Sequence, residues 1–239
     1  CVKTGTLTRK LEGHNAPVGT VCISADDKTI ITGSDDASVR MWSFDGDLLC
    51  IMIGHEDKVR SVTICSDFKN IFSAGEDKCI LVWNMEGKLQ HTLEGHAAGV
   101  NAVVVTRDGQ TVLTGSSDCT VRVWKNDGKL LQPKAHPKGV TTLTCSKSGR
   151  HVYSACEDGF VRVWNWQGHL LRQWQAHDER INSLAVSPDG ERLVTASDDF
   201  TLKLWNTKGT RLRDLLGHEK DVTCCCFRPS DGAVVSGSE

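Results

Sequence analysis

The chain of 239 residues has little of several features that mark particular protein classes. No apolar run has the length of a membrane span, so we expect no transmembrane segment. The formal net charge is −2, so the chain has no overall positive charge that would attract nucleic acid or an anionic membrane. Aromatic residues make up only 6% and include one Tyr, which argues against a stacking platform for single-stranded nucleic acid. No stretch combines helical apolar periodicity with helix caps, so we expect an all-β protein.

The sequence also lacks the short motifs that carry common chemistries. It contains no GxxxxGK[ST] phosphate loop, no GxSxG nucleophile turn and no HExxH zinc motif. The segments "GSDDAS" and "ASDDFT" hold paired carboxylates, but these lack the ligand spacing of a calcium loop. We therefore expect no catalytic residue, no cofactor, no metal and no small-molecule substrate.

Cysteine, by contrast, is plentiful. The eleven cysteines are an odd number, and none forms a CxxC pair with a second pair at zinc-finger spacing. Cys22, Cys65, Cys145 and the run 224–226 fall in apolar stretches, where free Cys behaves as a small hydrophobe. We expect free thiols, and therefore a reducing compartment, cytoplasm or nucleus. No signal-peptide pattern is present. Because residue 1 is Cys rather than Met, we expect the sequence to be a piece of a longer chain. Whether a targeting segment precedes residue 1 in that chain is left open.

A strict internal repeat organises the chain. Tryptophans recur at steps of 40 or 41 residues, at Trp42, Trp83, Trp124, Trp164 and Trp205. Histidines follow the same period, at His14, His55, His96, His136, His177 and His218. A hydroxyl lies 18 residues after each His, at Thr32, Ser73, Thr114, Ser154, Thr195 and Ser236. Four residues later comes an aspartate, at Asp36, Asp77, Asp118, Asp158 and Asp199. Such fixed spacing indicates units that stack on their neighbours in one geometry.

Each unit is predicted to form four short strands. In the unit that begins at His55, the expected strands cover residues 59–64, 70–75, 79–83 and 88–93, with turn segments between them. Pro133 falls in the last strand of its unit, which predicts an edge position, because Pro cannot donate to a ladder. Turn glycines that favour a positive φ recur at Gly46, Gly87, Gly128, Gly168 and Gly209.

The unit "GH…V…S/T-G…D…V-x-V-W" resembles the WD40 repeat. The resemblance covers the whole chain as one domain, 1–239, with repeats at 4–43, 44–84, 85–125, 126–165, 166–206 and 207–239, the last truncated. It departs from the family pattern in one way, because the residue after each Trp is never Asp: it is Ser43, Asn84, Lys125, Asn165 or Asn206.

The resemblance implies a WD40 β-propeller with five complete four-stranded blades and a sixth partial blade shared by the two termini. Residues 221–227 and 232–237 would supply its inner strands, and residues 4–12 its outer strand. We expect a segment of a longer chain, whose parent has seven blades or two propellers in tandem. A six-bladed ring with one defective blade is the alternative.

His, Ser/Thr and Asp together suggest a catalytic triad. A triad needs one special environment, however, and these residues recur in every unit. By the resemblance, Asp36, His14, Thr32 and Trp42 would form a buried chain of hydrogen bonds, and the same would hold in the later repeats, with His218 and Ser236 in the last. The physical reason is that a buried indole N–H and a buried carboxylate each need a partner.

The resemblance places partner binding on one face, in the loops that enter the first strands and those between the second and third strands. The matching residues differ between repeats while the network residues do not: Pro17, Asp35, Lys58, Arg60, Glu76, Asn101, Ser117, Thr141, Glu157, Arg180, Asn182, Asp198 and Asp221. Lys58, Arg60 and Arg180 could meet an acidic or phosphorylated peptide. Asp35, Glu76, Glu157 and Asp198 could meet a basic one. The alternative is a solvated loop surface, because exposed charges usually contribute little.

We therefore expect a non-catalytic scaffold or adaptor that docks protein or peptide partners on that face. A sensor or regulatory array within a larger nucleotide-switch protein is the alternative, by family analogy. A nucleic-acid binder is disfavoured by the net charge. An enzyme is disfavoured because no unique nucleophile, metal set or phosphate loop is present. Trp166 and Trp174 lie outside the repeating Trp position, and either cover the rim of one blade or form an aromatic contact site on its side.

Overall fold

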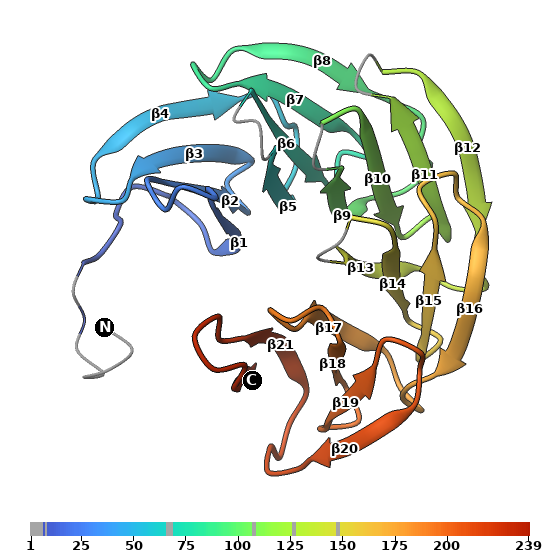
Figure 1. Ribbon diagram of the computed structural model, residues 1–239. Helices are drawn as coiled ribbons and strands as arrows, with labels where there is room; N and C mark the ends of the chain where they lie inside the picture. The colour runs from blue at the N-terminus through green and yellow to red at the C-terminus, as the bar shows by residue number, and fades with distance from the viewer. Residues whose placement is uncertain (1–6, 8, 66–68, 107–108, 126–127, 147–148) are drawn as a thin grey trace. The chain divides into compact units, whose positions relative to one another are not determined.

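The computed structural model describes residues 7, 9–65, 69–106, 109–125, 128–146 and 149–239. All regular secondary structure in these residues is β-strand, and each complete repeat forms one four-stranded antiparallel sheet (Figure 1). We call each sheet a blade and number the blades in chain order. The chain divides into two compact units, residues 1–100 with 107–109 and residues 101–106 with 110–239. The expected all-β class with four-stranded blades is confirmed.

The first unit contains blades 1 and 2. Blade 1 consists of β1 (Val18–Ile23), β2 (Thr29–Ser34), β3 (Ser38–Ser43) and β4 (Leu48–Ile53). Blade 2 consists of β5 (Val59–Ile64), β6 (Asn70–Gly75), β7 (Ile80–Asn84) and β8 (Leu89–Leu93). The strands expected in this repeat match these bounds to within one residue at each end.

The second unit contains the other blades, apart from the first residue of β9. Blade 3 consists of β9 (Val100–Val105), β10 (Thr111–Ser116), β11 (Thr120–Lys125) and β12 (Leu130–Ala135). Blade 4 consists of β13 (Val140–Cys145), β14 (Val152–Cys156), β15 (Phe160–Trp164) and β16 (Leu170–Gln175). Blade 5 consists of β17 (Ile181–Val186), β18 (Arg192–Ser197), β19 (Leu202–Asn206) and β20 (Arg211–Leu215). Blade 6 consists of β21 (Val222–Phe227) and β22 (Val234–Ser238).

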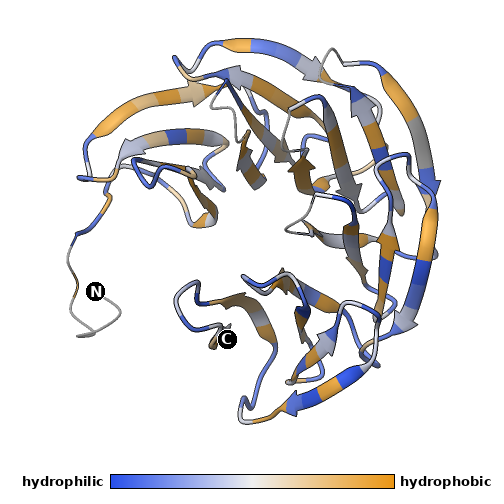
Figure 2. Cartoon of the chain, viewed as in Figure 1, coloured by the Kyte–Doolittle hydropathy of each residue, from blue (hydrophilic) through white to orange (hydrophobic). Residues whose placement is uncertain are grey.

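The hydrophobic core lies between neighbouring blades. In the first unit, Ile31 and Val39 of blade 1 pack with Val59, Ile71 and Trp83 of blade 2. Three clusters of the same kind join blades 3 to 4, 4 to 5 and 5 to 6 in the second unit. Figure 2 shows hydrophobic residues on the inner strands of the blades, and hydrophilic residues interspersed along the outer strands β8, β12, β16 and β20, whereas the outer strand β4 is hydrophobic along its length. Each blade is thus stabilised mainly by its neighbours.

Blade 1 presents one uncovered apolar face within the first unit. Val18 and Val21 of β1 are 50% and 62% exposed, whereas the equivalent Val59 and Val62 of blade 2 are 0% and 6% exposed. Blade 2 owes this burial to blade 1, because β5 packs against β1 and β2.

The outer strand expected from residues 4–12 is not found in the described part of that range, because Leu7 and residues 9–12 carry no strand. A fourth strand hydrogen-bonds to the third strand of its own blade, and the described part of blade 6 contains only β21 and β22. Residues 9–13 instead run beside blade 1, where Arg9 forms an ion pair with Asp45 at 2.7 Å. Residues 1–6 and 8 lie outside the described residues.

Two other expectations are confirmed. Pro133 pairs with Arg122 in β12, which is the edge strand of blade 3. The five turn glycines all adopt a positive φ, between 76° and 100°. A second set of positive-φ residues, directly after each network aspartate, was not expected: Ala37, Lys78, Cys119, Gly159 and Phe200. These residues turn the chain tightly from the second strand into the third.

Candidate functional site

Each complete blade places its four recurring residues on separate elements: His before the first strand, the hydroxyl in the second, Asp in the following turn and Trp in the third. In blade 1, His14 Nδ1 lies 2.9 Å from Asp36 Oδ2, and His14 Nε2 lies 2.8 Å from Thr32 Oγ1. The indole nitrogen of Trp42 donates to Thr32 Oγ1 at 2.9 Å. The chain of bonds therefore ties the third strand to the loop that enters the first.

Blades 2 and 5 repeat this geometry. In blade 2 the three distances are 2.7, 2.8 and 2.8 Å, between His55 and Asp77, His55 and Ser73, and Trp83 and Ser73. In blade 5 they are 2.7, 2.7 and 3.0 Å, between His177 and Asp199, His177 and Thr195, and Trp205 and Thr195.

The direction of each hydrogen bond follows from the ionised aspartate, which can only accept. His Nδ1 therefore carries the proton, and Nε2 accepts from the Ser or Thr hydroxyl. The hydroxyl oxygen in turn accepts the indole N–H. The first three members match a catalytic triad in type, but Ser73 and Thr195 are 0% exposed and their oxygens already accept from Trp. A buried hydroxyl engaged on both sides cannot reach a substrate, so the arrangement is structural.

The aspartates are held in their ionised form. Burial by itself raises the pKa of Asp36, but hydrogen bonds from Ser38 Oγ at 2.6 Å, from Asn15 N at 3.0 Å and from His14 outweigh it and hold the pKa well below its usual range. The pKa values of Asp77 and Asp199 are lowered in the same way against burial. Burial lowers the pKa of His177, which keeps its imidazole neutral beside the carboxylate.

The charged residues predicted to bind partners lie at one end of each blade, where the first strand begins and the second ends. The structure brings them together as ion pairs. In the first unit, Lys58 lies 3.1 Å from Asp35, and Arg60 lies 2.7 Å from Glu76. In the second unit, Arg180 lies 3.9 Å from Glu157. Each basic side chain expected to meet an acidic peptide is therefore already beside a carboxylate.

Three polar residues from the same set instead link one blade to the next within the second unit. Asn101 donates to Val140 O at 2.8 Å and to Ser117 Oγ at 3.0 Å. The other two link blade 4 to blade 5 and blade 5 to blade 6: Thr141 donates to Ile181 O at 2.6 Å, and Asn182 donates to Val222 O at 3.1 Å and to Asp198 at 2.5 Å.

A β-bulge explains how these side chains reach a neighbouring blade. The register between first and second strands shifts at this position, for example between Ile181 and Ser183 and between Val140 and Thr142. A bulge re-aims the side chain of the extra residue, which strand alternation alone does not reveal. The remaining two predicted residues, Pro17 and Asp221, contribute backbone carbonyls that accept from Asp35 N at 2.9 Å and Glu239 N at 3.3 Å.

A scan against known protein families matches the chain to the model described as "WD40: WD domain, G-beta repeat". The matched segments are residues 5–43, 46–84, 87–125, 128–165, 168–206 and 209–239. The chain belongs to the WD40 repeat family. No curated protein matches the chain.

WD40 repeats generally mediate protein–protein interactions, and WD40 domains are typically non-catalytic. In the described part of the chain, no three His, Cys, Asp or Glu side chains come together in a group that could hold a metal ion. The same residues contain no helix with the length and hydropathy needed to cross a bilayer.

The fourth WD40 repeat departs from the expected network. Trp164 donates to Ser154 at 2.8 Å as in the other blades. His136, however, turns its Nδ1 to the Cys156 thiol at 3.0 Å and to Arg162 at 3.3 Å. Its Nε2 is buried without a hydrogen-bond partner among the described residues. The predicted links from His136 to Asp158 and to Ser154 are therefore not formed.

Two substitutions within the repeat account for this change. Cys156 stands where the other complete repeats have Ser or Gly, and its thiol occupies the space beside Nδ1. Phe160 stands where blades 1, 3 and 5 have Ser or Thr, so Asp158 lacks the hydroxyl donor and takes a 2.6 Å ion pair with Arg162 instead. Burial and Arg162 lower the pKa of His136 to about 4.

The arginine of this pair belongs to a recurring feature that the sequence reasoning missed. A basic residue follows the network aspartate by four positions in four of the five complete repeats. The nitrogen-to-oxygen distances are 3.9, 3.7, 2.6 and 3.6 Å for Arg40, Arg122, Arg162 and Lys203. The signal was present as a periodic Arg or Lys in the third strand.

Blades 3 and 6 show parts of the network. In blade 3, the indole of Trp124 donates to Thr114 at 2.9 Å, and the Thr120 hydroxyl donates to Asp118 at 2.6 Å. The histidine of this repeat, His96, is buried and belongs to the first unit, whereas these four residues belong to the second. In blade 6, His218 Nε2 lies 2.8 Å from Ser236 Oγ.

The two tryptophans outside the repeating position cover blades. Trp166 packs against the core between blades 3 and 4, and its indole nitrogen donates to Gly149 O at 2.6 Å. The ring of Trp174 lies 6.0 Å from that of Trp205. Both are partly buried, which favours the interpretation that they cover the rim of a blade.

Proposed function

We propose that this WD40 chain is a non-catalytic docking platform that binds protein or peptide partners at the loop end of its blades. The supporting observation is the contrast between network and loop positions. The network residues are nearly uniform and buried, whereas the loop-end charges vary between repeats and stay accessible. Lys58, Arg60 and Arg180 keep 45%, 41% and 49% of their side-chain surface exposed.

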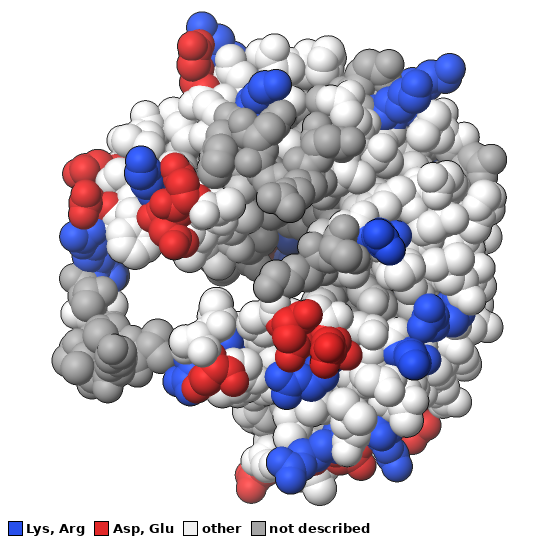
Figure 3. All heavy atoms as spheres, viewed as in Figure 1, with Lys and Arg blue, Asp and Glu red and all other residues white. Residues whose placement is uncertain are grey.

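The charge pairs define the chemistry of the partner. Figure 3 shows small groups in which acidic and basic side chains lie together, separated by uncharged surface. An anionic ligand that approached Arg60 would also meet Glu76, which already accepts from the guanidinium at 2.7 Å. We therefore favour a partner surface that carries both signs and exchanges its own charges with these pairs. This replaces the simpler expectation of a purely acidic or purely basic peptide.

The thiols support a reducing compartment, cytoplasm or nucleus. All ten described cysteines are free. Burial raises the pKa of Cys225 to about 12, so this thiol stays protonated and packs as an apolar group.

An affinity capture with matched variants tests the docking surface. One variant carries Lys58→Ala, Arg60→Ala and Arg180→Ala at the loop end. The control carries Lys88→Ala, Arg211→Ala and Arg213→Ala, which remove the same charge from the outer edges of blades 2 and 5. We expect the loop-end variant to lose proteins that the wild-type chain and the control both retain. Equal capture by both variants would place the docking surface elsewhere.

A salt titration of the captured complex separates this proposal from nucleic-acid binding. Phosphate contacts release counterions, so nucleic-acid affinity falls steeply with salt. We expect a shallow dependence, because the loop-end charges are already paired. A steep slope that nuclease treatment abolishes would favour the nucleic-acid alternative.

A further inference from the structure

The fourth strand of blade 1 differs in composition from the other fourth strands. β4 reads LLCIMI and contains neither a charged residue nor a proline, and Figure 2 shows it as hydrophobic along its length. The fourth strands of blades 2 to 5 read LQHTL, LLQPKA, LLRQWQ and RLRDL, so each holds a charged residue, a proline or several polar residues. Such residues protect an exposed strand edge from pairing, and β4 lacks them.

The outer edge of β4 has no partner strand. Within the described part of blade 1, β4 is the end strand of the sheet and pairs only with β3. The fourth strand is an end strand of its sheet in all of blades 1 to 5. The open edge of β4 is therefore a property of the blade itself, and the backbone N–H and C=O groups along it can pair with an added strand.

The two faces of β4 have different surroundings. Cys50 and Met52 pack in the core between blades 1 and 2, and Met52 is only 1% exposed. Leu49, Ile51 and Ile53 alternate with them along the strand and are 52%, 46% and 79% exposed. We call these three residues the β4 stripe. One face of β4 thus fixes the strand to its blade, while the other presents apolar side chains next to the open edge.

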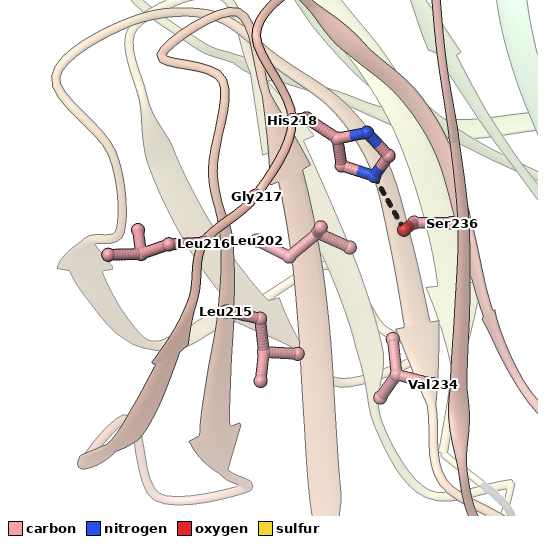
Figure 4. Close-up of a pocket in the computed structure, with 7 residues that line it drawn as sticks. All are labelled: Leu202, Leu215, Leu216, Gly217, His218, Val234 and Ser236. Atoms are coloured by element: carbon pink, nitrogen blue, oxygen red, sulfur yellow. Dashed lines mark hydrogen bonds between the residues drawn. The ribbon is translucent and has the colours of Figure 1, made fainter.

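The exposure of the β4 stripe does not depend on whether a blade precedes blade 1. In blade 2, which has blade 1 beside it, the three equivalent residues are also exposed: Gln90, Thr92 and Glu94. In blade 5, the first and third equivalents, Leu212 and Leu216, are 51% and 77% exposed. Figure 4 shows the alternation there, with Leu215 turned toward Val234 of the next blade and Leu216 turned away from it.

Only blade 1 fills all three stripe positions with large apolar residues. The same positions hold Gln, Thr and Glu in blade 2, and Leu, Pro and Ala in blade 3. They hold Leu, Gln and Gln in blade 4, and Leu, Asp and Leu in blade 5. A contiguous apolar surface at positions that face water in the other blades indicates contact with another molecule.

Acidic side chains stand at both ends of β4. Asp47 directly precedes the strand, Glu56 and Asp57 follow it in the next loop, and all three are exposed. Among the described residues, none of the three forms an ion pair with Lys or Arg, whereas Asp45 pairs with Arg9 at 2.7 Å. Residues 14–57 hold eight Asp or Glu and only two Lys or Arg. Blade 1 therefore offers negative charge on either side of its apolar stripe.

The positions of these charges distinguish a second copy of the chain from a different polypeptide. Antiparallel pairing of two β4 strands would bring Asp47 of one copy toward Glu56 and Asp57 of the other. Parallel pairing would place each acid beside its own equivalent. Both arrangements bring like charges together, which is unfavourable. A strand with Lys or Arg at both of its ends would instead meet opposite charge at both ends, whichever direction it takes.

We propose that the outer edge of β4 binds an extended segment of another protein by strand addition, and that this segment has an apolar centre and basic residues at both ends. Its backbone hydrogen-bonds to β4, and the apolar side chains on one of its faces lie beside the β4 stripe. Its Lys or Arg residues lie near Asp47 at one end and near Glu56 and Asp57 at the other.

Calorimetric titration with matched synthetic peptides tests this recognition. The peptide KRVTITVRK has an apolar face and basic ends, and the control peptide DEVTITVED keeps the centre but reverses the end charges. We expect saturable binding of the basic peptide, and binding of the acidic peptide that is weaker by about tenfold or more at low salt. Added salt should narrow this difference, because it screens exposed charges. Absence of binding by the basic peptide, or equal affinity for both peptides, would overturn the proposal.

Variants of the β4 stripe locate the site. The stripe variant introduces uncharged residues that blades 2 and 4 have at the same positions: Leu49→Gln, Ile51→Thr and Ile53→Gln. The control removes exposed leucines from the fourth strands of blades 4 and 5: Leu171→Gln and Leu212→Thr. We expect the stripe variant to bind the basic peptide about tenfold more weakly or worse, because apolar contact is lost, and the control to bind like the wild type. Wild-type affinity in the stripe variant would contradict the assignment.

Variants of the acidic ends test the charge preference. One variant neutralises the acids beside β4: Asp47→Asn, Glu56→Gln and Asp57→Asn. The control neutralises three exposed acids of the second unit: Glu191→Gln, Asp214→Asn and Glu219→Gln. We expect the first variant alone to weaken binding of the basic peptide severalfold at low salt. If both variants bind it as tightly as the wild type, the acids do not select the partner and the proposal fails.

Methylated peptides and hydrogen exchange test the backbone pairing. Methylation of alternate amides blocks one edge of the peptide strand, so one alternate set should abolish binding and the other should permit it. Tolerance of both sets would refute strand addition. Bound peptide should also slow amide exchange in β4, and unchanged exchange there would count against the site.

Light scattering and the loop-end variant complete the test. A wild-type dimer that the stripe variant abolishes would show that a second copy occupies the edge, whereas we expect a monomer that binds one peptide. The proposal does not rest on loop-end docking. The loop-end variant of Lys58, Arg60 and Arg180 should bind the basic peptide at least as tightly as the wild type, because it removes a positive charge next to Asp57. The two proposals can therefore fail separately.

Discussion

Replacement of two equivalent histidines tests whether the buried network stabilises the blades. His177 of blade 5 bonds Asp199 and Thr195, both at 2.7 Å. His136 of blade 4 has the same sequence position but contacts only a thiol and a guanidinium, and its Nε2 has no hydrogen-bond partner among the described residues. We expect His177→Ala to destabilise the protein more than His136→Ala.

The size of the difference follows from these contacts. A hydrogen bond to a charged group contributes about 1.5–3 kcal/mol, and a neutral one about 0.5–1.5 kcal/mol. Loss of both bonds of His177 therefore costs about 2–4 kcal/mol. The two rings are similarly buried, at 1% and 6% exposure, so the loss of ring packing nearly cancels between the variants. His136→Ala also removes an unpartnered buried donor, which offsets part of its cost.

Urea and thermal unfolding, followed by Trp fluorescence, measure the two variants side by side. A chain of this size loses about 2–4 °C in Tm per kcal/mol, so the Tm of His177→Ala should lie about 5–15 °C below that of His136→Ala. Similar Tm values, or a lower Tm for His136→Ala, would show that the network bonds do not carry the stability assigned to them.

Three further predictions concern the same elements. Cys156→Ser should raise the free energy of unfolding by about 1 kcal/mol, since Ser34 in the equivalent position bonds Pro17 O and Asp36 N, and an unchanged Tm would contradict this. Burial lowers the pKa of His136 to about 4 in the folded chain. As the pH falls from 6.5 towards 4, the imidazole is therefore protonated in the unfolded chain but not in the folded one. Stability should therefore decrease over that range, and less steeply in His136→Phe; equal slopes would argue against the lowered pKa. Asn182→Ala should cost about 1–2 kcal/mol, because it links blades 5 and 6, and Lys58→Ala less than about 1 kcal/mol; chemical denaturation should show this order.

The sequence predicted the strands and much of the network because both depend on position within the repeat. A period of 40 or 41 residues places each His, hydroxyl, Asp and Trp at the same point of the same four-stranded unit, and residues 59–64 and 70–75 form strands as predicted. The positions of His14 and Thr32 beside Asp36 follow from this regularity.

The rest depends on side-chain size and local backbone geometry, which the period does not encode. Cys156 differs from serine by one atom, yet its thiol takes the place of a network partner of His136. Asn182 was expected to face a partner, but a bulge aims it at a carbonyl of the next blade. Lys58 and Asp35 lie in different repeats, so only the packing of blades reveals that they form an ion pair.

The uncovered face of blade 1 has a consequence for how the first unit opens. Within the first unit, the burial of Val59 and Val62 in blade 2 depends on the interface with blade 1. When stability is a sum of nearest-neighbour terms, loss of a shared interface removes stability from both of its members. Opening of blade 1 should therefore expose Val59 and Val62 as well, and proteolysis of the first unit should reach both blades together.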